Sequence, residues 1–297
     1  MQLGYVGLGT MGLPMALNLL RAGFALQVIS RSRPPLDQAI AAGAVEAPGY
    51  AELAAQSDVV HTCLPMPADV EAVYLGSNGL VANARPGTVL IDHSTVGPGT
   101  CRKIDAAARN RGVHFLDAPV SGGPAGAQAA TLGIMVGGEP AVFERMLGVL
   151  QILGKTVVRL GPSGSGAVAK LVNNLLVGVH QRALIEMLLV GQRAGVDLDA
   201  LVQVLLGSSG RSAVLEMMYP RLKARDLQPR FRSDLFHKDL SLALEMAADC
   251  GVHSLTGEAA LEAMQATMAA GLGGRDSLAM LLPLEQGAGM RLFEPDP

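Results

Sequence analysis

The chain has 297 residues, which at about 150 residues per domain predicts two domains. Lys and Arg number 23 against 26 Asp and Glu, so the formal charge is −3 and no basic surplus favours nucleic acid or an anionic membrane surface. Hydrophobic residues make up 49% and charged residues 16%, which excludes the composition of a disordered chain and predicts a compact, soluble protein.

Short apolar runs alternate with amphipathic stretches over about the first 160 residues. The runs predict strands at residues 3–6, 25–30, 59–64, 89–92, 114–117, 134–136 and 156–160, and the stretches between them predict helices such as 14–22, 51–56, 100–111 and 140–150. Strands that alternate with helices imply βαβ units. We therefore expect an α/β, Rossmann-type, doubly wound and largely parallel sheet with helices on both faces.

A run of glycine, proline and serine at 161–166 separates two predicted domains, residues 1–162 and 163–297. Residues 167–194 then predict one helix, about 42 Å long. Because it is mostly apolar, we expect this helix to be buried between the domains. Further helices are predicted at 198–206, 212–225, 238–250, 256–270 and 276–286, and no comparable strand pattern follows, so the second domain is expected to be all-α.

The first predicted strand leads into a glycine-rich turn before a helix. The turn reads Gly7-Leu8-Gly9-Thr10-Met11-Gly12, a Gly-x-Gly-x-x-Gly pattern. Its glycines allow a tight turn, close approach of a pyrophosphate and helix–strand packing, and the helix N-terminus supplies free N–H donors. In this context the pattern predicts dinucleotide binding rather than a purely structural turn.

The end of the second predicted strand indicates which dinucleotide binds. An NAD site usually has Asp or Glu about 20 residues after the glycines, where it binds the ribose hydroxyls. This chain instead has Ser30-Arg31-Ser32-Arg33. A guanidinium can bind a 2′-phosphate, so we predict NADP. NAD remains the alternative if both arginines are only solvated surface charges.

Two later segments carry polar groups that folding alone does not explain. Asp117-Ala118-Pro119-Val120-Ser121-Gly122-Gly123 offers a hydroxyl and unhindered backbone N–H groups for a small anion, although it could equally be an ordinary glycine-rich loop. In Gly164-x-Gly166-x-x-x-Lys170-x-x-Asn173-Asn174, Lys170 and Asn174 share one helix face. The functional interpretation is a proton-transferring ammonium beside a substrate-binding amide, and the alternative is a solvated helix face.

A third segment, His237-Lys238-Asp239, is predicted to open a helix. Asp239 is expected to bind the free N–H groups of the first turn, with Lys238 as a surface lysine paired with it. From the residues alone, this structural interpretation is preferred to a functional one.

Together these motifs resemble those of the β-hydroxyacid dehydrogenase family, which includes 3-hydroxyisobutyrate dehydrogenases, tartronate semialdehyde reductases and glyoxylate/succinic semialdehyde reductases. The resemblance covers nearly the whole chain: residues 7–19 are similar to the N-terminal motif, 117–123 to the substrate motif and 164–174 to the catalytic motif. It implies a 6-phosphogluconate dehydrogenase-like architecture, in which a long helix joins the Rossmann domain to the all-α domain, and a homodimer or homotetramer.

The resemblance also implies roles for single residues. Lys170 matches the catalytic lysine, and the expected substrate contacts are Ser121, Gly122, Gly123, Asn174 and Lys238. The expected cofactor contacts are Gly7, Leu8, Gly9, Thr10, Met11, Gly12, Ser30, Arg31, Ser32, Leu64, Pro65, Thr95 and Lys238. Ser30 replaces the Asn of NADP-preferring members, which keeps NAD open. His93 and His237 match no role in the family.

The implied activity is hydride transfer between nicotinamide and a small, carboxylate-bearing β-hydroxyacid or its aldehyde, with Lys170 as general acid/base. One alternative is an imine reductase of the same architecture, against which Lys170 argues. Another is an NADP(H)-binding module without catalysis. Neither has as good an explanation for Lys170, Asn174 and Ser121 together.

The cysteines and the hydropathy pattern predict a cytoplasmic protein. Cys63, Cys101 and Cys250 are odd in number and far apart, so reduced thiols are expected rather than disulfides. No Cys and His cluster predicts a metal site. No apolar run reaches the ~20 residues that span a bilayer, and no signal segment is recognised, so neither a membrane nor a nucleic acid is an expected partner.

Overall fold

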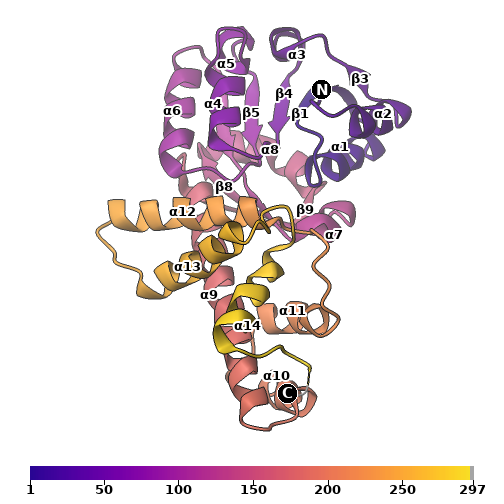
Figure 1. The fold of residues 1–297 in the computed structure, drawn as a ribbon. Helices are drawn as coiled ribbons and strands as arrows, with labels where there is room; N and C mark the ends of the chain where they lie inside the picture. The colour runs from indigo at the N-terminus through magenta and orange to yellow at the C-terminus, as the bar shows by residue number, and fades with distance from the viewer. Residues whose placement is uncertain (295–297) are drawn as a thin grey trace. The chain divides into compact units, whose positions relative to one another are not determined.

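The computed structural model describes residues 1–294, and its internal contacts form two compact units. The first unit is Met1–Leu171 and the second begins at Val172. The predicted boundary at 162/163 lies at the turn before the long helix, whereas the contacts divide the chain within that helix. Figure 1 shows both units, which are described separately below.

The first unit is built on one sheet with the strand order β3-β2-β1-β4-β5-β6-β8-β7, and β9 pairs with β8. The strands are β1 (Gln2–Val6), β2 (Ala25–Ile29), β3 (Val45–Glu46), β4 (Val59–Thr62), β5 (Val89–Asp92), β6 (His114–Asp117), β7 (Val120–Ser121), β8 (Leu132–Gly138) and β9 (Gly154–Gly161). Strands β1 to β6 pair in parallel, as the sequence predicts. β8 is antiparallel to β6 and β7. The order reverses between β1 and β4, where ligands of such sheets bind.

Helices cover both faces of this sheet (Figure 1). They are α1 (Gly12–Arg21), α2 (Arg33–Ala41), α3 (Tyr50–Gln56), α4 (Pro67–Leu75), α5 (Leu80–Asn83), α6 (Pro98–Arg109), α7 (Gly123–Gln128) and α8 (Pro140–Gln151). Of these, α2, α4, α5 and α7 were not among the helices that the sequence analysis named. α2, α4 and α7 begin with proline at the first or second helical position, where no backbone N–H is needed.

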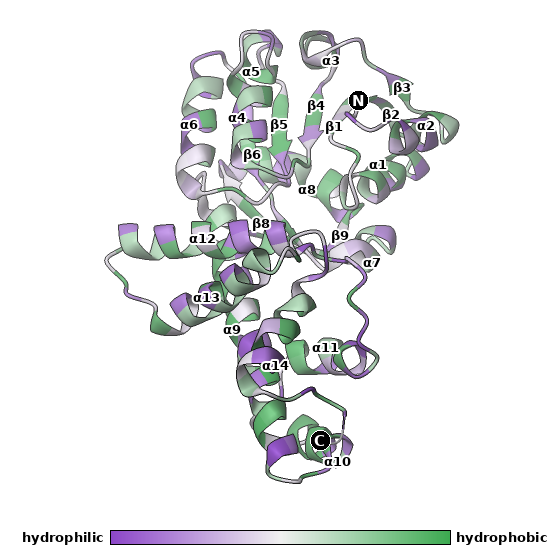
Figure 2. Cartoon of the chain, viewed as in Figure 1, coloured by the Kyte–Doolittle hydropathy of each residue, from purple (hydrophilic) through white to green (hydrophobic). Residues whose placement is uncertain are grey.

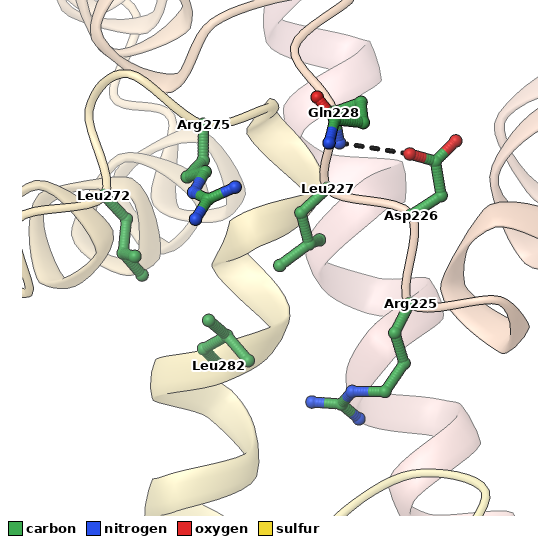
Figure 3. Close-up of a pocket in the computed structure, with 7 residues that line it drawn as sticks. All are labelled: Arg225, Asp226, Leu227, Gln228, Leu272, Arg275 and Leu282. Atoms are coloured by element: carbon green, nitrogen blue, oxygen red, sulfur yellow. Dashed lines mark hydrogen bonds between the residues drawn. The ribbon is translucent and has the colours of Figure 1, made fainter.

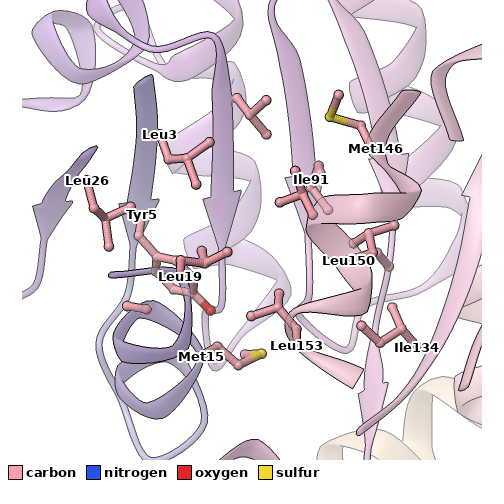
Figure 4. Close-up of a cluster of buried hydrophobic side chains, with 14 of the residues drawn as sticks. Leu3, Tyr5, Met15, Leu19, Leu26, Ile91, Ile134, Met146, Leu150 and Leu153 are labelled. Atoms are coloured by element: carbon pink, nitrogen blue, oxygen red, sulfur yellow. The ribbon is translucent and has the colours of Figure 1, made fainter. Parts of the chain in front are cut away.

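Side chains of β1 alternate between two cores. Leu3 and Tyr5 pack with Met15 and Leu19 of α1 (Figure 4), whereas Val6 belongs to the core on the opposite face. The period of two residues is that of a strand buried on both sides. The central strand β5 is hydrophobic along most of its length (Figure 2). The sheet is therefore enclosed on both faces, and its strand ends are where polar side chains gather.

The second unit is helical within the described residues. α9 (Ser165–Arg193) begins in the first unit and continues into the second, followed by α10 (Leu198–Leu206), α11 (Ala213–Lys223), α12 (Ser233–Asp249), α13 (Leu255–Ala269), the 3-10 helix η1 (Ser277–Met280) and α14 (Leu281–Ala288). Their core includes Ile185, Phe236 and Met264. No helix within residues 1–294 combines the length and apolar composition required to cross a membrane.

One expectation about these helices is wrong: α12 begins at Ser233 rather than at Lys238. Along α9, the side chains of Val172, Leu176 and Met187 are more than half exposed. Ser233 donates its N–H to the Arg275 carbonyl and its hydroxyl to the Asp276 carbonyl, so long-range contacts set the start of α12.

Candidate active site

The glycine-rich turn between β1 and α1 has three glycines, of which two are closely packed and one faces open space. A Cβ at Gly7, whose φ is +95°, would lie 2.3 Å from the Cys63 carbonyl oxygen, and one at Gly12 would lie 1.9 Å from the Gly7 oxygen. A Cβ at Gly9 would meet nothing within 4 Å. The first and third glycines thus serve close packing, whereas Gly9 leaves open space. No side chain caps α1, so its N-terminus suits a pyrophosphate.

The other predicted cofactor contacts follow neighbouring parallel strands. Ser30 follows β2, Leu64 and Pro65 follow β4, and Thr95 follows β5. Because parallel strands end at one edge of the sheet, these residues gather at the edge where the glycine-rich turn follows β1. The residues present therefore fit a dinucleotide.

A buried carboxylate, Asp92, joins the ends of β4 and β5. Its Oδ1 accepts hydrogen bonds from the hydroxyls of Thr62 and Ser94, each at 2.6 Å, and Ser94 Oγ accepts from Leu64 N–H at 2.8 Å. Burial raises the pKa of Asp92, and the hydrogen bonds from Ser94 and Thr62 oppose this rise. The network fixes the backbone at Leu64, a predicted cofactor contact.

Both arginines after β2 already have acidic partners. Arg31 Nη1 lies 3.1 Å from Asp69 Oδ1, and the Arg31 side chain is 71% exposed. Arg33 pairs with Asp37 and Glu46. Solvent screens such exposed pairs, so an incoming phosphate can compete for either guanidinium. No acidic residue occupies positions 30–33, where an NAD site usually has one.

His93, which had no expected role, belongs to a buried histidine pair. His61 Nδ1 lies 2.9 Å from His93 Nε2, and His93 Nδ1 lies 2.8 Å from the Ala118 carbonyl oxygen. A carbonyl can only accept, so His93 donates from Nδ1 and accepts at Nε2 from His61. Burial lowers the pKa of His93 to about 4 and that of His61 well below its usual value, so both are neutral. The pair thereby holds the backbone at Ala118, within the predicted substrate motif.

The predicted anion-binding loop forms a sharp turn between β7 and α7. Ser121 pairs with Gly133 of β8, and Gly122 and Gly123 have φ values of +131° and +61°. Side chains rarely adopt such angles. A Cβ at Gly123 would meet nothing within 4 Å, so its backbone is open to a small ligand.

Asp117, at the end of β6, binds the start of α9. Its Oδ1 accepts from Gly164 N–H at 2.7 Å and its Oδ2 accepts from Ala167 N–H at 3.0 Å. Lys170 lies one turn further along α9, half-buried. Asp117 thus links the strand that leads to Ser121 with the helix that carries Lys170.

In the second unit, Asp239 lies between two predicted substrate contacts. Its Oδ2 accepts from Asn174 Nδ2 at 2.6 Å, and its Oδ1 lies 3.0 Å from Lys238 Nζ. Asn173 Nδ2 donates to Asn174 Oδ1 at 3.0 Å. The expected pairing of Lys238 with Asp239 is confirmed, but the expected cap and surface position are wrong. Asp239 does not cap a first turn, because α12 begins at Ser233, and the Lys238 and Asp239 side chains are only 11% and 3% exposed.

A hollow of about 310 Å³ in the second unit contains no predicted site residue (Figure 3). It is lined by Arg225, Asp226, Leu227, Gln228, Leu272, Arg275 and Leu282. Arg225 is held by both carboxylate oxygens of Glu285 at 2.8 Å. Because its guanidinium is bound to Glu285 in this way, Arg225 has a structural role in the second unit.

Four polar residues at or beside these motifs have long-range partners that the sequence did not indicate: Asp117, Asp239, His61 and His93. Their contacts join positions at least 25 apart in the chain, such as 117 with 164 and 174 with 239. The only local signal was their type, a charged or titratable side chain in an apolar segment. Such a side chain is costly to bury unless it is paired.

Comparisons with known proteins agree with this arrangement. Residues 2–161 match the NAD binding domain of 6-phosphogluconate dehydrogenase, and residues 164–284 match the NAD-binding domain of NADP-dependent 3-hydroxyisobutyrate dehydrogenase. The chain is 37% identical over 290 residues to 2-(hydroxymethyl)glutarate dehydrogenase of Eubacterium barkeri, covering 97% of this chain and 96% of the relative. It is 38% identical over 282 residues to NAD-dependent L-serine dehydrogenase of Pseudomonas aeruginosa, covering 93% and 95%.

Solved structures give the same result. The 3-hydroxyisobutyrate dehydrogenase of Mycobacterium tuberculosis with L-serine superimposes with a TM-score of 0.88 at 32% identity, covering 95% of this chain and 98% of that one. An imine reductase from Myxococcus stipitatus reaches a TM-score of 0.64 at 18% identity, which indicates a shared fold alone. The chain therefore belongs to the β-hydroxyacid dehydrogenase family and is an NAD(P)-dependent oxidoreductase that acts on the CH–OH group of a hydroxyacid.

Proposed function

We propose that Lys170 is the general acid/base of this oxidoreduction. A nicotinamide dinucleotide held at the glycine-rich turn would supply the hydride chemistry. Lys170 Nζ takes the hydroxyl proton during oxidation or returns it to the carbonyl oxygen during reduction. The observation that carries this proposal is the Asp117 link, because it ties the helix bearing Lys170 to the strand leading to Ser121. Two motifs with complementary chemistry thus have a fixed connection.

The substrate is proposed to be a small β-hydroxyacid with a free carboxylate, or its aldehyde. Backbone N–H groups at Gly122 and Gly123 and the Ser121 hydroxyl suit that carboxylate. In the second unit, Asn174 keeps one amide hydrogen beyond its bond to Asp239, and Lys238 stays a proposed substrate contact on the family resemblance alone. The relatives named for 3-hydroxyisobutyrate, L-serine and 2-(hydroxymethyl)glutarate make these three compounds the first to assay.

For the cofactor, NADP is proposed over NAD. Arg31 and Arg33 lie next to the end of β2, no acid occupies positions 30–33, and the exposed pair of Arg31 with Asp69 is open to competition from a 2′-phosphate. Fluorescence titration measures the Kd values of NADPH and NADH, and the Kd of NADPH is expected to be the lower of the two.

The role of Lys170 is tested with Lys170→Met, which keeps side-chain length and removes the amine. Turnover of the best substrate is expected to fall by at least about 10²-fold, while the dinucleotide Kd stays within about threefold. Lys155→Met is the matched control, because Lys155 is an exposed lysine on β9, and its turnover is expected to equal that of the unmodified chain. Turnover within a few fold of normal in Lys170→Met would refute the proposal.

The same assay distinguishes the two alternatives. Reduction of a cyclic imine without any hydroxyacid activity would favour an imine reductase. Dinucleotide binding without turnover across hydroxyacids, semialdehydes and imines would favour a module without catalysis. Lys170 and the Ser121 loop together support the hydroxyacid reaction over both.

Self-association is proposed through α9. Val168, Val172 and Leu176 are exposed large apolar side chains spaced four residues apart, so they form one stripe along the helix. A second copy of the chain is the proposed cover, as a homodimer or homotetramer, and sedimentation of the purified chain measures which. The cytoplasm stays the predicted location, supported by the odd number and wide spacing of Cys63, Cys101 and Cys250 in the sequence.

A further inference from the structure

The N-terminal turn of α9 is held by a residue far away in the sequence. Asp117 is 47 positions before Gly164, yet both of its carboxylate oxygens accept backbone N–H groups of this turn. Where α10, α11 and α13 have a side-chain cap, it comes from the residue directly before the helix: Asp197, for example, accepts from Ala200 N–H at 2.8 Å. The cap on α9 is therefore a tertiary contact, and it connects two motifs instead of ending one helix.

The surroundings of this carboxylate admit only glycine at two places. Gly137 pairs with Asp117 in the ladder between β6 and β8, and a Cβ there would lie 2.6 Å from both carboxylate oxygens. A Cβ at Gly166 would lie 2.9 Å from Oδ2 and 2.2 Å from the Met135 carbonyl oxygen. The close approach of β6, β8 and α9 is thus built around the Asp117 side chain.

The charge of Asp117 is stabilised by backbone dipoles. The side chain is buried, and burial raises the pKa of the carboxyl, while backbone N–H groups of Gly164, Ala167 and Gly166 oppose the rise. Burying a carboxylate is costly, and a serine or asparagine cap would satisfy one N–H at a lower cost. A carboxylate accepts from two donors at once and favours the positive end of the helix, so it fixes the direction of α9 more firmly.

We propose that Asp117 is a positioning residue for the reaction: it fixes the first turn of α9, and with it Lys170, relative to the loop that carries Ser121. This rests on the proposed role of Lys170. Ala167 is three residues before Lys170, so the two side chains lie on adjacent turns of one helix. Because a misplacement of about 1 Å can cost about 10²-fold in rate, a small shift of this turn is enough to impair proton transfer.

The test is a double-mutant cycle of Asp117→Asn and Lys170→Met. Asparagine keeps the shape but presents an NH2 group to one of the two N–H donors, so one contact is lost. In the unmodified background, Asp117→Asn is expected to lower kcat by about 10–100-fold, with dinucleotide Kd and KM within about threefold. In the Lys170→Met background, Asp117→Asn is expected to lower the residual kcat by less than about twofold, because Asp117 acts on the reaction through the lysine.

Equal losses of kcat in both backgrounds would overturn the inference, because a purely structural defect does not depend on Lys170. An unchanged kcat in Asp117→Asn would also overturn it. If instead Lys170→Met keeps its turnover, the proposed function fails first, so the two failures are distinguishable. Asp197→Ala is the matched control: it removes the cap of α10 and is expected to leave kcat unchanged.

A second variant covers the case in which Asp117→Asn does not fold. Gly137→Ala keeps Asp117 and pushes a methyl group against both carboxylate oxygens, so it is expected to lower kcat in the same Lys170-dependent way. Gly148→Ala, on α8 with nothing within 4 Å of its Cβ, is its control and is expected to behave like the unmodified chain. If Gly137→Ala lowers kcat by the same factor in the unmodified and in the Lys170→Met background, the proposal is contradicted.

Discussion

At the end of β2, Arg31 shows how a single surface contact can influence cofactor choice. Its guanidinium pairs with Asp69, from α4, and both groups are reachable by solvent. Such a pair adds little to stability, because water and salt screen it. A phosphate carries more charge than a carboxylate and can accept two parallel hydrogen bonds from Arg31, so it is expected to displace Asp69.

The first prediction concerns this residue. Arg31→Asp is expected to weaken NADPH binding by about 10–100-fold and NADH binding by less than about threefold, because only NADPH has the 2′-phosphate that an acid repels. Fluorescence titration with both dinucleotides measures the two Kd values. Arg85→Asp, which breaks a similar exposed pair with Asp58, is the control and should leave both unchanged. Equal weakening of both dinucleotides would show that Arg31 does not select the phosphate.

At the scale of elements, the turn from β1 to α1 separates packing from binding. Gly12 lies where the helix meets the strand, and a Cβ there would overlap the Gly7 carbonyl oxygen. Gly9 faces open space and is exposed. Two glycines three residues apart thus serve different purposes, one in helix–strand packing and one in the approach of a ligand.

The second prediction contrasts these two glycines. Gly12→Ala is expected to lower the free energy of unfolding by about 1–3 kcal/mol, because the helix must move away from β1. Gly9→Ala is expected to leave Tm within about 1 °C but to weaken dinucleotide binding by at least about tenfold, because its methyl group occupies the space for the pyrophosphate. Thermal unfolding and dinucleotide titration of both variants measure this. Normal dinucleotide binding by Gly9→Ala would place the pyrophosphate elsewhere.

At the scale of the whole molecule, the neutral histidine pair makes stability depend on pH. The pKa of His93 is about 4 in the fold, against about 6.5 when unfolded, and the pKa of His61 is also lowered by burial. Below pH 6.5 the unfolded chain therefore binds more protons than the folded one. The free energy of unfolding falls as pH falls from about 6.5 towards 4, and above 6.5 the pair contributes no pH dependence.

The third prediction follows from this sign. Between pH 6.5 and pH 5, His93 alone is expected to lower the free energy of unfolding by about 1.5 kcal/mol, measured by urea unfolding at each pH. His93→Gln can still donate to the Ala118 carbonyl and should show a flatter dependence. Burial raises the pKa values of Asp92 and Asp117, so these two groups make the free energy of unfolding rise as the pH falls. The unmodified chain and His93→Gln share this contribution, so it cancels when the two are compared. Equal pH dependence in both would mean that His93 is not buried neutral.

Most of the fold could be predicted from the sequence because its signals are local. The apolar runs gave the seven predicted strands, and the glycine turn at Gly7–Gly12 has the packing that its pattern predicts. The short strands β3 and β7 were missed because two residues are too few to show a period. The start of α12 was misplaced because contacts of Ser233 with residues 275 and 276, not a local stop signal, determine it.

By itself, then, the sequence determined the α/β first domain, the helical second domain, the glycine turn and the family motifs, because residue type and spacing are enough to specify strands, helices and turns. Only the tertiary structure decided which polar side chains meet: Asp117 with the first turn of α9, His93 with Ala118, and Asp239 with Asn174. These contacts join residues 25 to 65 positions apart. Chain topology brings such residues together, and no local pattern records that.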